Sequence, residues 1–306
     1  MLCHWDEVPE RPVEHGPMRA GWTDLGAAAG SVDVGLRRIR IHPGAQSTPA
    51  HVHDVEEELC YVLGGEGLSW QDGTTYAVRA GDALVHLARG AAHTLVAGDD
   101  GLDVLMFGQR VWAELGRLPR AGVAWLGASW VEPGAPPHPW EREAAAGPVP
   151  VDGGPEPRPP GIVAVADVEG EERRRGDTGM VRRNVGVALG SRSTGMRLLE
   201  IEPGMHGYPA HCHSAEEELF VVLDGDGTLL LGSDAHPVRR GHVVACPAGS
   251  GLAHRFRAGD GGLTVIAYGE RKPDDVAWYP RSQKVFMRGL DVAFRVQEVD
   301  YWEGEE

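Results

Sequence analysis

The feature of this sequence that most constrains its fold is an internal repeat, in which one pattern of residues returns after 160 positions. The recurring elements are Pro43-Gly44 and Pro203-Gly204, His51-Val52-His53 and His211-Cys212-His213, Glu56-Glu57-Glu58 and Glu216-Glu217-Glu218, Gly65 and Gly225, and Gly81 and Gly241. One inserted residue then aligns His93 with His254. A chain of 306 residues is long enough for each copy to bury a core of its own. The repeat therefore predicts two related domains.

The stretch between the two copies is rich in proline, including Pro136-Pro137 and Pro159-Pro160, and has no amphipathic period. This composition predicts a stiff, extended linker laid against the surface of a domain, with one short helix from Trp140 to Ala146. The predicted organisation is an N-terminal domain at 1–131, a linker at 132–161 and a C-terminal domain at 162–306.

The chain is acidic, because 29 Lys and Arg residues face 45 Asp and Glu residues and leave a formal net charge of −16. Such a field repels phosphate backbones, so nucleic acid is not an expected partner. No apolar run is long enough to cross a bilayer, and Met1 to Glu7 lack the pattern of an export signal. We therefore expect a cytoplasmic protein with no membrane partner. The four cysteines form neither a zinc pattern nor a disulfide framework, and we expect free thiols.

Within each copy the pattern is one short strand after another. Residues 36–41 end at Pro43-Gly44, residues 59–63 end at Gly64-Gly65, and residues 68–70 run into Gln71-Asp72-Gly73, a hairpin turn signal. Helical periodicity is nearly absent. Many short antiparallel strands must protect their edges, and closing into a small barrel or jelly roll does so. The sequence therefore predicts an all-β fold.

The repeated polar residues carry the chemistry. His51 and His53 point to the same face of a strand, because strand side chains alternate. Glu58 follows His53 by an odd interval, so a bend through residues 54–56 is needed before Glu58 can face the histidines. His93 can complete the set from across the barrel. Three imidazoles and one carboxylate suit a divalent Fe, Mn, Ni, Co, Cu or Zn ion, and four ligands leave positions open on an octahedral ion.

The same residues resemble the two sequence motifs of the cupin family. The first copy has Gly44-x6-His51-x-His53-x4-Glu58-x6-Gly65 and Gly81-x11-His93, and the second has Gly204-x6-His211-x-His213-x4-Glu218-x6-Gly225 and Gly241-x5-Pro247-x-Gly249-x4-His254. The chain thus looks like a bicupin, which implies two double-stranded β-helix (jelly-roll) barrels with up to one metal ion each. The metal ligands that the resemblance implies are His51, His53, Glu58, His93, His211, His213, Glu218 and His254.

Two details depart from the family pattern or leave a choice. Residues 87–90 of the first copy replace the Pro-x-Gly that cupins place there, and both copies add residues before the last histidine. In cupins the glutamate ligand lies seven residues before the closing glycine, which selects Glu58 and Glu218. Glu57 and Glu217 are the alternative.

Residues beyond the ligands give weaker signals. Cys60, His86, Tyr208 and Cys246 are candidates for lining the cavities, and a packed core cysteine and a rim histidine are the plain alternatives. His86 aligns with Cys246 and Cys60 with Phe220, which predicts a more polar lining in the first barrel. The segment from Tyr279 to Lys284 is interpreted as a tail strand with an anion-binding role as the alternative.

The sequence favours a metal-dependent enzyme acting on a small polar organic substrate, with a dioxygenase first and a decarboxylase or isomerase second. No catalytic residue is assigned. Oxalate is disfavoured, because Thr48 and Tyr208 stand where oxalate decarboxylases generally carry arginine. The alternative is a binding or sensing protein in which the metal organises a small-ligand pocket. One site can also be purely structural or empty, and a homodimer is an open alternative to the monomer.

Overall fold

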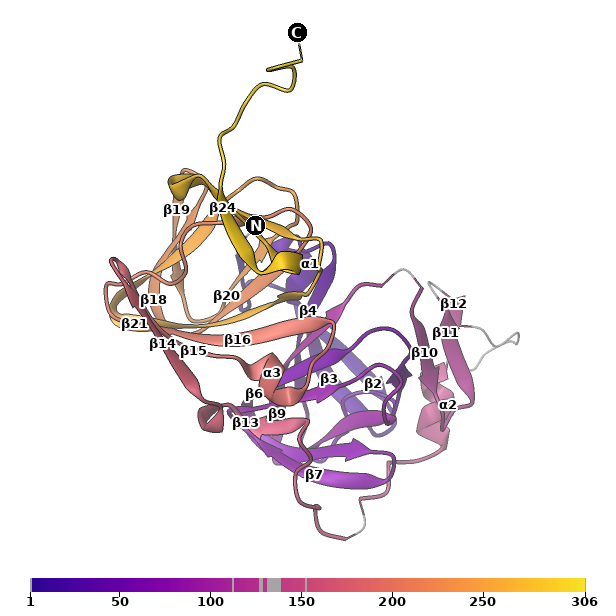
Figure 1. Cartoon of the computed structure of the whole chain (residues 1–306). Coiled ribbons are helices and arrows are strands. Elements are labelled where there is room, and N and C mark those ends of the chain that lie inside the picture. Colours follow the sequence, from indigo (N-terminus) through magenta and orange to yellow (C-terminus); the bar gives the residue numbers. More distant parts are fainter. Residues whose placement is uncertain (1, 112, 127–128, 131–138, 152, 306) are drawn as a thin grey trace.

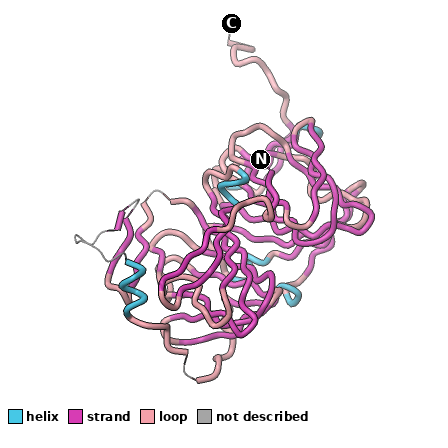
Figure 2. Tube along the Cα trace, turned by 180° about the vertical axis from the view of Figure 1, so that it is seen from behind, coloured by secondary structure: helices cyan, strands magenta, loops and turns pink. Residues whose placement is uncertain are grey.

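Strands make up most of the described chain, as the short runs between glycine turns predict. The structure is a computed structural model that describes residues 2–111, 113–126, 129–130, 139–151 and 153–305. Figure 1 shows two β-rich halves of similar build, and Figure 2 shows how little of the chain is helical. The predicted all-β class with two jelly-roll units is confirmed, although the sheets are open and do not close into continuous hydrogen-bonded barrels.

The elements follow one another in the same order in both halves. Those of the N-terminal half are β1 (Leu2–His4), β2 (Arg11–His15), β3 (Met18–Asp24), α1 (Leu25–Ala29), β4 (Val34–Ile41), β5 (Val52–His53), β6 (Glu58–Gln71), β7 (Thr74–Arg79), β8 (Asp82–His86), β9 (His93–Gln109), β10 (Leu115–Leu118), β11 (Val123–Leu126), β12 (Ser129–Trp130) and α2 (Pro139–Ala145). Those of the C-terminal half are β13 (Ile162–Ala164), η1 (Val165–Asp167), β14 (Gly170–Arg175), β15 (Thr178–Arg183), α3 (Val185–Leu189), β16 (Thr194–Ile201), β17 (Cys212–His213), β18 (Glu218–Leu231), β19 (Asp234–Arg239), β20 (His242–Cys246), β21 (His254–Glu270), β22 (Val276–Tyr279), η2 (Pro280–Ser282), β23 (Lys284–Met287), η3 (Arg288–Leu290) and β24 (Val292–Arg295).

The two halves also share one sheet topology. The large sheet of the N-terminal half has the order β13-β8-β6-β9-β4-β3-β2, and its counterpart has the order β1-β20-β18-β21-β16-β15-β14. The small sheets are β12-β11-β10-β5 and β17-β22-β23-β24. In both halves the strand register is irregular where β6 passes Gly65 and β18 passes Gly225. Both glycines have positive φ and lie so close to a facing carbonyl that a Cβ would clash. The internal repeat is therefore a repeat of fold.

The halves exchange strands at the edges of their large sheets. β1, at the N-terminus, pairs with β20 of the C-terminal half, with Leu2 opposite Val244. β13, the first strand of the C-terminal half, pairs with β8, with Ile162 opposite Leu84. The division into 1–131, 132–161 and 162–306 stays a prediction. Each of the two large sheets contains one strand from the other half of the chain.

A single apolar core joins the two halves. It contains Leu36, Leu59 and Phe107 from the N-terminal half and their repeat equivalents Met196, Leu219 and Tyr268 from the C-terminal half. The rings of Phe107 and Tyr268 lie 5.0 Å apart between centroids. The expectation that the two units pack against each other within one chain is confirmed, because this core removes apolar side chains of both halves from water.

Two buried glutamates fasten this interface from opposite sides. Glu57 accepts hydrogen bonds from the backbone N–H groups of Arg192 (3.0 Å), Ser193 (3.1 Å) and Thr194 (2.7 Å) in the other half, and from the Ser191 hydroxyl (2.6 Å). Glu217 returns the interaction to the turn before β4, where it accepts N–H groups of residues 32–34 and the hydroxyl of Ser31. Each half therefore holds a loop of the other with a carboxylate.

The linker lies against the N-terminal half, as predicted. The guanidinium of Arg158 forms an ion pair with the buried carboxylate of Asp82, and Trp70 Nε1 donates to the carbonyl of Pro150 at 3.0 Å. The expected short helix is present as α2. The residues 132–138 of the predicted linker, with Pro136-Pro137, lie outside the described residues.

All four cysteines are free thiols, as expected. Across the described ranges, no helix has the length and hydropathy that crossing a bilayer requires.

We expect the Glu57→Gln variant to be less stable than the wild type by about 2 kcal/mol at neutral pH, because an amide cannot replace a carboxylate that accepts several buried donors. Burial by itself would raise the pKa of Glu57, but its donors outweigh this and hold that pKa below its ordinary value. The stabilisation is therefore complete above the unfolded-state pKa of about 4.3 and is lost as the pH falls further.

Urea unfolding of both proteins across pH 3 to 8, roughly the range in which carboxylates titrate, measures this difference in the free energy of unfolding. The exposed Glu66→Gln variant is the control and should match the wild type. A difference between Glu57→Gln and the wild type that is independent of pH would contradict the assignment.

Candidate metal centres

The first candidate site forms where β5, β6 and β9 meet. A pair of backbone hydrogen bonds between His51 and His93 joins the loop before β5 to the start of β9. The Nε2 atoms of His51, His53 and His93 lie 3.5, 3.6 and 3.2 Å from the carboxylate oxygens of Glu58. All four predicted residues are thus brought together, with their donor atoms pointing to one place.

The second site repeats this arrangement at β17, β18 and β21. The Nε2 atoms of His211, His213 and His254 lie 3.9, 3.3 and 3.0 Å from the Glu218 carboxylate. His211 and His254 are joined by the same pair of backbone hydrogen bonds as their equivalents. The repeat in sequence is therefore a repeat of site geometry.

The choice between neighbouring glutamates follows from strand alternation. The predicted bend is present after His53, and the chain then enters β6. Glu57 points into the interface with the other half, while Glu58 points to the imidazoles. Glu217 and Glu218 divide in the same way. The fallback residues Glu57 and Glu217 thus have another role, which their buried partners define.

The rings and the carboxylate are held in a state that suits ligation. The Nδ1 atoms of His51 and His93 lie 2.9 and 3.1 Å from the carbonyls of Pro49 and Ala91. Each Nδ1 then carries the proton, and the lone pair of Nε2 is available to a metal ion. Burial alone would raise the pKa of Glu58, but the charge on His53 and hydrogen bonds from the histidines hold it well below its ordinary value. Glu58 therefore stays ionised.

The donor set fits a divalent transition metal. His53 Nε2 and His213 Nε2 are buried and have no hydrogen-bond partner among the described residues, although each faces a carboxylate. Ligand atoms of His51, His53 and Glu58 all lie within 4.8 Å of one another, as do those of His211, Glu218 and His254. An ion coordinated there would satisfy these nitrogens, and mixed imidazole and carboxylate ligation suits the first-row metals that the sequence predicts.

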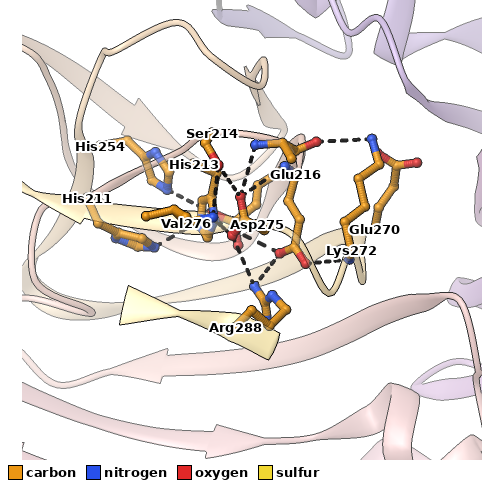
Figure 3. A network of polar contacts seen from close by, with 12 residues as sticks. His211, His213, Ser214, Glu216, His254, Glu270, Lys272, Asp275, Val276 and Arg288 are labelled. Carbon is orange, nitrogen blue, oxygen red and sulfur yellow. Dashed lines mark hydrogen bonds and ion pairs between the residues drawn. The ribbon is translucent and has the colours of Figure 1, made fainter. Parts of the chain in front are cut away.

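Two acidic residues that support the sites were missed in the sequence. Asp275 Oδ2 lies 2.7 Å from His213 Nδ1, and Asp275 Oδ1 accepts the N–H groups of Ala215 and Glu216 (Figure 3). Glu114 does the same in the first site, where it faces His53 Nδ1 at 3.4 Å and accepts the N–H groups of residues 54–56. Both therefore fix the bend and one histidine. Figure 3 also shows Arg288 beside Asp275 and Glu216, so that cluster is an ion-pair network.

Only one of the four predicted cavity residues is found lining a described cavity. Tyr208 lines the cavity in front of the second site. Cys60 and Cys246 belong to the apolar cores behind the sites. His86 stacks on the back of His93, with ring centroids 3.7 Å apart, and burial holds its pKa well below the ordinary value. The plain alternative of a packed core cysteine describes Cys60 and Cys246. His86 is buried behind His93 and is not the rim histidine of the other alternative.

The predicted difference in polarity between the two cavities is wrong. The first cavity, in front of His51, His53 and Glu58, is mainly apolar, and its large side chains are Trp22, Met106, Leu118, Trp125 and Trp140. The second cavity, in front of His211, His213, Glu218 and His254, contains four arginines, which are Arg182, Arg197, Arg255 and Arg288. The prediction failed because it relied on Cys60 and His86, which lie behind the ligands. The arginines come from other strands and loops.

Comparison with known proteins agrees with this picture. The cupin domain family matches twice, at residues 37–108 and 197–267. A mutant of the Bacillus subtilis oxalate decarboxylase has a similar structure, with a TM-score of 0.58 and 16% identity over 90% of this chain and 78% of that one. A formate complex of the Lactobacillus farciminis oxalate decarboxylase gives 0.58 and 16% over 89% and 86%. At this identity the likeness concerns the fold. No curated protein matches the sequence.

Removing one histidine from either site should remove its ion. We expect His51→Ala and His211→Ala each to lower the bound metal by about one ion per chain, because each variant loses one of the four ligands that the site offers to the ion. Inductively coupled plasma mass spectrometry of the purified proteins measures this, with the exposed His42→Ala as the control. Unchanged metal in both site variants would refute the ligand assignment.

Each supporting carboxylate, Glu114 or Asp275, should affect metal binding only at the site whose histidine it contacts. Asp275→Asn should weaken metal retention at the second site by about 10- to 100-fold and leave the first unchanged, and Glu114→Gln should do the reverse. Dialysis against graded chelator, followed by metal analysis, gives the retention of the first site in the His211→Ala background and of the second site in the His51→Ala background. Equal weakening of both sites in either variant would indicate general destabilisation and would contradict the local role.

Proposed function

Since the chain belongs to the cupin superfamily as a bicupin, with one cupin domain in each half, we propose that it is a metal-dependent enzyme acting on a small polar organic substrate. Oxygenation is the reaction that we place first, and decarboxylation or isomerisation is second. The proposed ligands are His51, His53, Glu58 and His93 in the first site and His211, His213, Glu218 and His254 in the second.

One observation carries this proposal. In each half, three Nε2 atoms converge on an ionised carboxylate at the wall of a cavity, and the buried Nε2 atoms of His53 and His213 lack hydrogen-bond partners among the described residues. A purely structural role would not need a cavity beside each site. A divalent ion held by four such ligands would supply Lewis acidity and, if redox active, access to O2 at its open positions.

Side chains of the protein orient the ligand histidines and line the cavity through which a substrate would enter. Fixed Nδ1 contacts keep the imidazole rings from turning, and the two support carboxylates, Glu114 and Asp275, hold the loops that carry His53 and His213. The second cavity, of about 340 Å³, can admit a small molecule beside His211. Its arginines and Tyr208 offer donors to a polar substrate.

The resemblance to oxalate decarboxylases supports the enzyme class more than the substrate. Those proteins are named for the decarboxylation of oxalate, and their likeness to this chain is a likeness of fold. Thr48 and Tyr208 take the positions before the first ligand histidine where the family resemblance would call for arginine. We therefore do not propose oxalate as the substrate.

The proposal predicts about two ions of Fe or Mn per chain in protein purified without oxygen or added metal, because both ligand sets are complete. Metal analysis by mass spectrometry comes first. The loaded protein is then tested with small acids, enols and thiols for O2 consumption and CO2 release, with the His51→Ala/His211→Ala double variant as the control.

Three outcomes are distinguishable. Turnover that the double variant lacks supports the enzyme. Bound metal without turnover of any compound favours the alternative, a binding or sensing protein whose pocket the metal organises. If no metal binds even after reconstitution, the metal-dependent function is wrong.

A further inference from the structure

The two cavities differ at positions that the repeat makes equivalent. Trp22 lies opposite Ile39 in the N-terminal half, and Arg182 lies opposite Leu199 at the same place in the C-terminal half. Thr94 opposite Trp70 likewise corresponds to Arg255 opposite Leu230. The strand register is the same in both halves, so the two members of each pair occupy equivalent places. In each pair the N-terminal half has an uncharged side chain and the C-terminal half has an arginine. The second half thus carries more positive charge than the first at places where the strand pairing is the same.

Strand alternation places one more arginine at the cavity wall. In β16, Thr194 and Met196 are fully buried, and Met196 packs in the core between the halves. The side chains of Arg197, Leu199 and Ile201 alternate with these and line the second cavity. Arg197 therefore shares the face of the strand that a substrate would contact.

The neighbouring arginines have ion-pair partners, whereas the guanidinium of Arg197 has none among the described residues. Arg255 binds the Asp177 carboxylate through two nitrogens, at 2.8 and 3.0 Å. Arg182 pairs with Glu171, and Arg288 pairs with Glu216. In the part of the chain that the structure describes, Arg197 forms no ion pair, and its buried Nε has no hydrogen-bond partner. A half-buried guanidinium without an anion is costly, so this position is suited to receive one.

The equivalent arginine of the N-terminal half has a different environment. Arg37 is exposed, and its guanidinium lies over the ring of Trp22, 5.3 Å from the centroid. That indole is the side chain that Arg182 replaces in the C-terminal half. Arg37 therefore has a partner within the protein. It also lies between the mainly apolar first cavity and a neighbouring hollow that contains the carboxylates of Asp24, Glu56 and Glu114.

We propose that the second cavity binds a small organic carboxylate through Arg197, next to the second site, and that the first cavity does not. One unpaired guanidinium provides one charge and a planar fork, which match one carboxylate. This inference rests on the proposed function only for the reaction that follows binding.

The entrance supports the same class of ligand. A basic groove is continuous with the second cavity, with which it shares Arg182, Tyr208, Arg255 and Tyr279. Arg173, Arg174, Arg175, Arg281 and Lys284 line it further out, and Glu172 and Asp177 are its acidic members. In a chain of net charge −16, such a groove attracts anions to one place. The segment from Tyr279 to Lys284 thus lies at the entrance.

The test is isothermal titration calorimetry of the full-length protein with malonate, with its neutral counterpart malonamide, and with inorganic phosphate. We expect malonate to bind and malonamide not to bind. Arg197→Gln should weaken malonate binding by at least about tenfold, because a hydrogen-bonded charge pair is lost. Arg257→Gln removes the same charge from an exposed position on β21 and should bind malonate as the wild type does. Arg37→Gln should also leave the binding unchanged.

The metal content of every preparation is measured beside the titrations, and thermal unfolding checks that the variants fold. If Arg197→Gln does not fold, Arg197→Lys is used, and it should weaken binding because lysine lacks the planar fork. Wild-type protein that binds metal but not malonate, equal malonate binding by wild type and the Arg197 variant, or tighter binding of phosphate would each overturn the inference while leaving the proposed function intact. Protein that binds malonate through Arg197 but holds no metal would support the inference and defeat the proposed function.

Discussion

The structure depends on two neighbouring carboxylates that point in opposite directions. Glu58 faces the three imidazoles of the first site, and Glu57, one residue earlier, is buried in a loop of the other half. A buried carboxylate needs several donors, and Glu57 finds them only across the interface. The loop that shapes a candidate metal centre is therefore anchored by the opposite half, and the same is true of Glu217 and Glu218. The position of each metal-site loop therefore depends on the contact between the two halves.

On this shared frame the two cavities have diverged. The ligand positions are retained in both halves, while the cavity wall carries the indole of Trp22 in the first half and the guanidinium of Arg182 at the equivalent place in the second. Such a change needs no alteration of backbone, because inward-facing positions of a strand can be replaced one by one. A duplicated fold can in this way keep one type of metal chemistry and present it to two kinds of molecule.

Much of the fold and of the ligand set could be predicted from the sequence, because both depend on local spacing. The His-x-His pairs, the bend before Glu58 and the glycine at position 65 are short-range features that the repeat shows twice. The supporting carboxylates could not be predicted in the same way. Glu114 and Asp275 lie far along the chain from the histidines they contact, and the residue type differs between the copies. The charge of the cavities was also beyond local reasoning, because alternation puts Arg197 on the same face as Leu199 and Ile201 but does not tell which face of the strand borders a cavity.

The exchanged strands bear on the order in which the chain can fold. His4 Nε2 lies 2.9 Å from the carbonyl of Arg240, a residue 236 positions later. During synthesis the N-terminal strand must therefore wait for most of the protein to emerge before its edge of the sheet can form. The large sheet of the N-terminal half can be completed earlier in synthesis, because its last strand, β13, directly follows the linker. Contacts between such distant segments are slow to close. The amino terminus, although made first, is thus among the last parts to find its place.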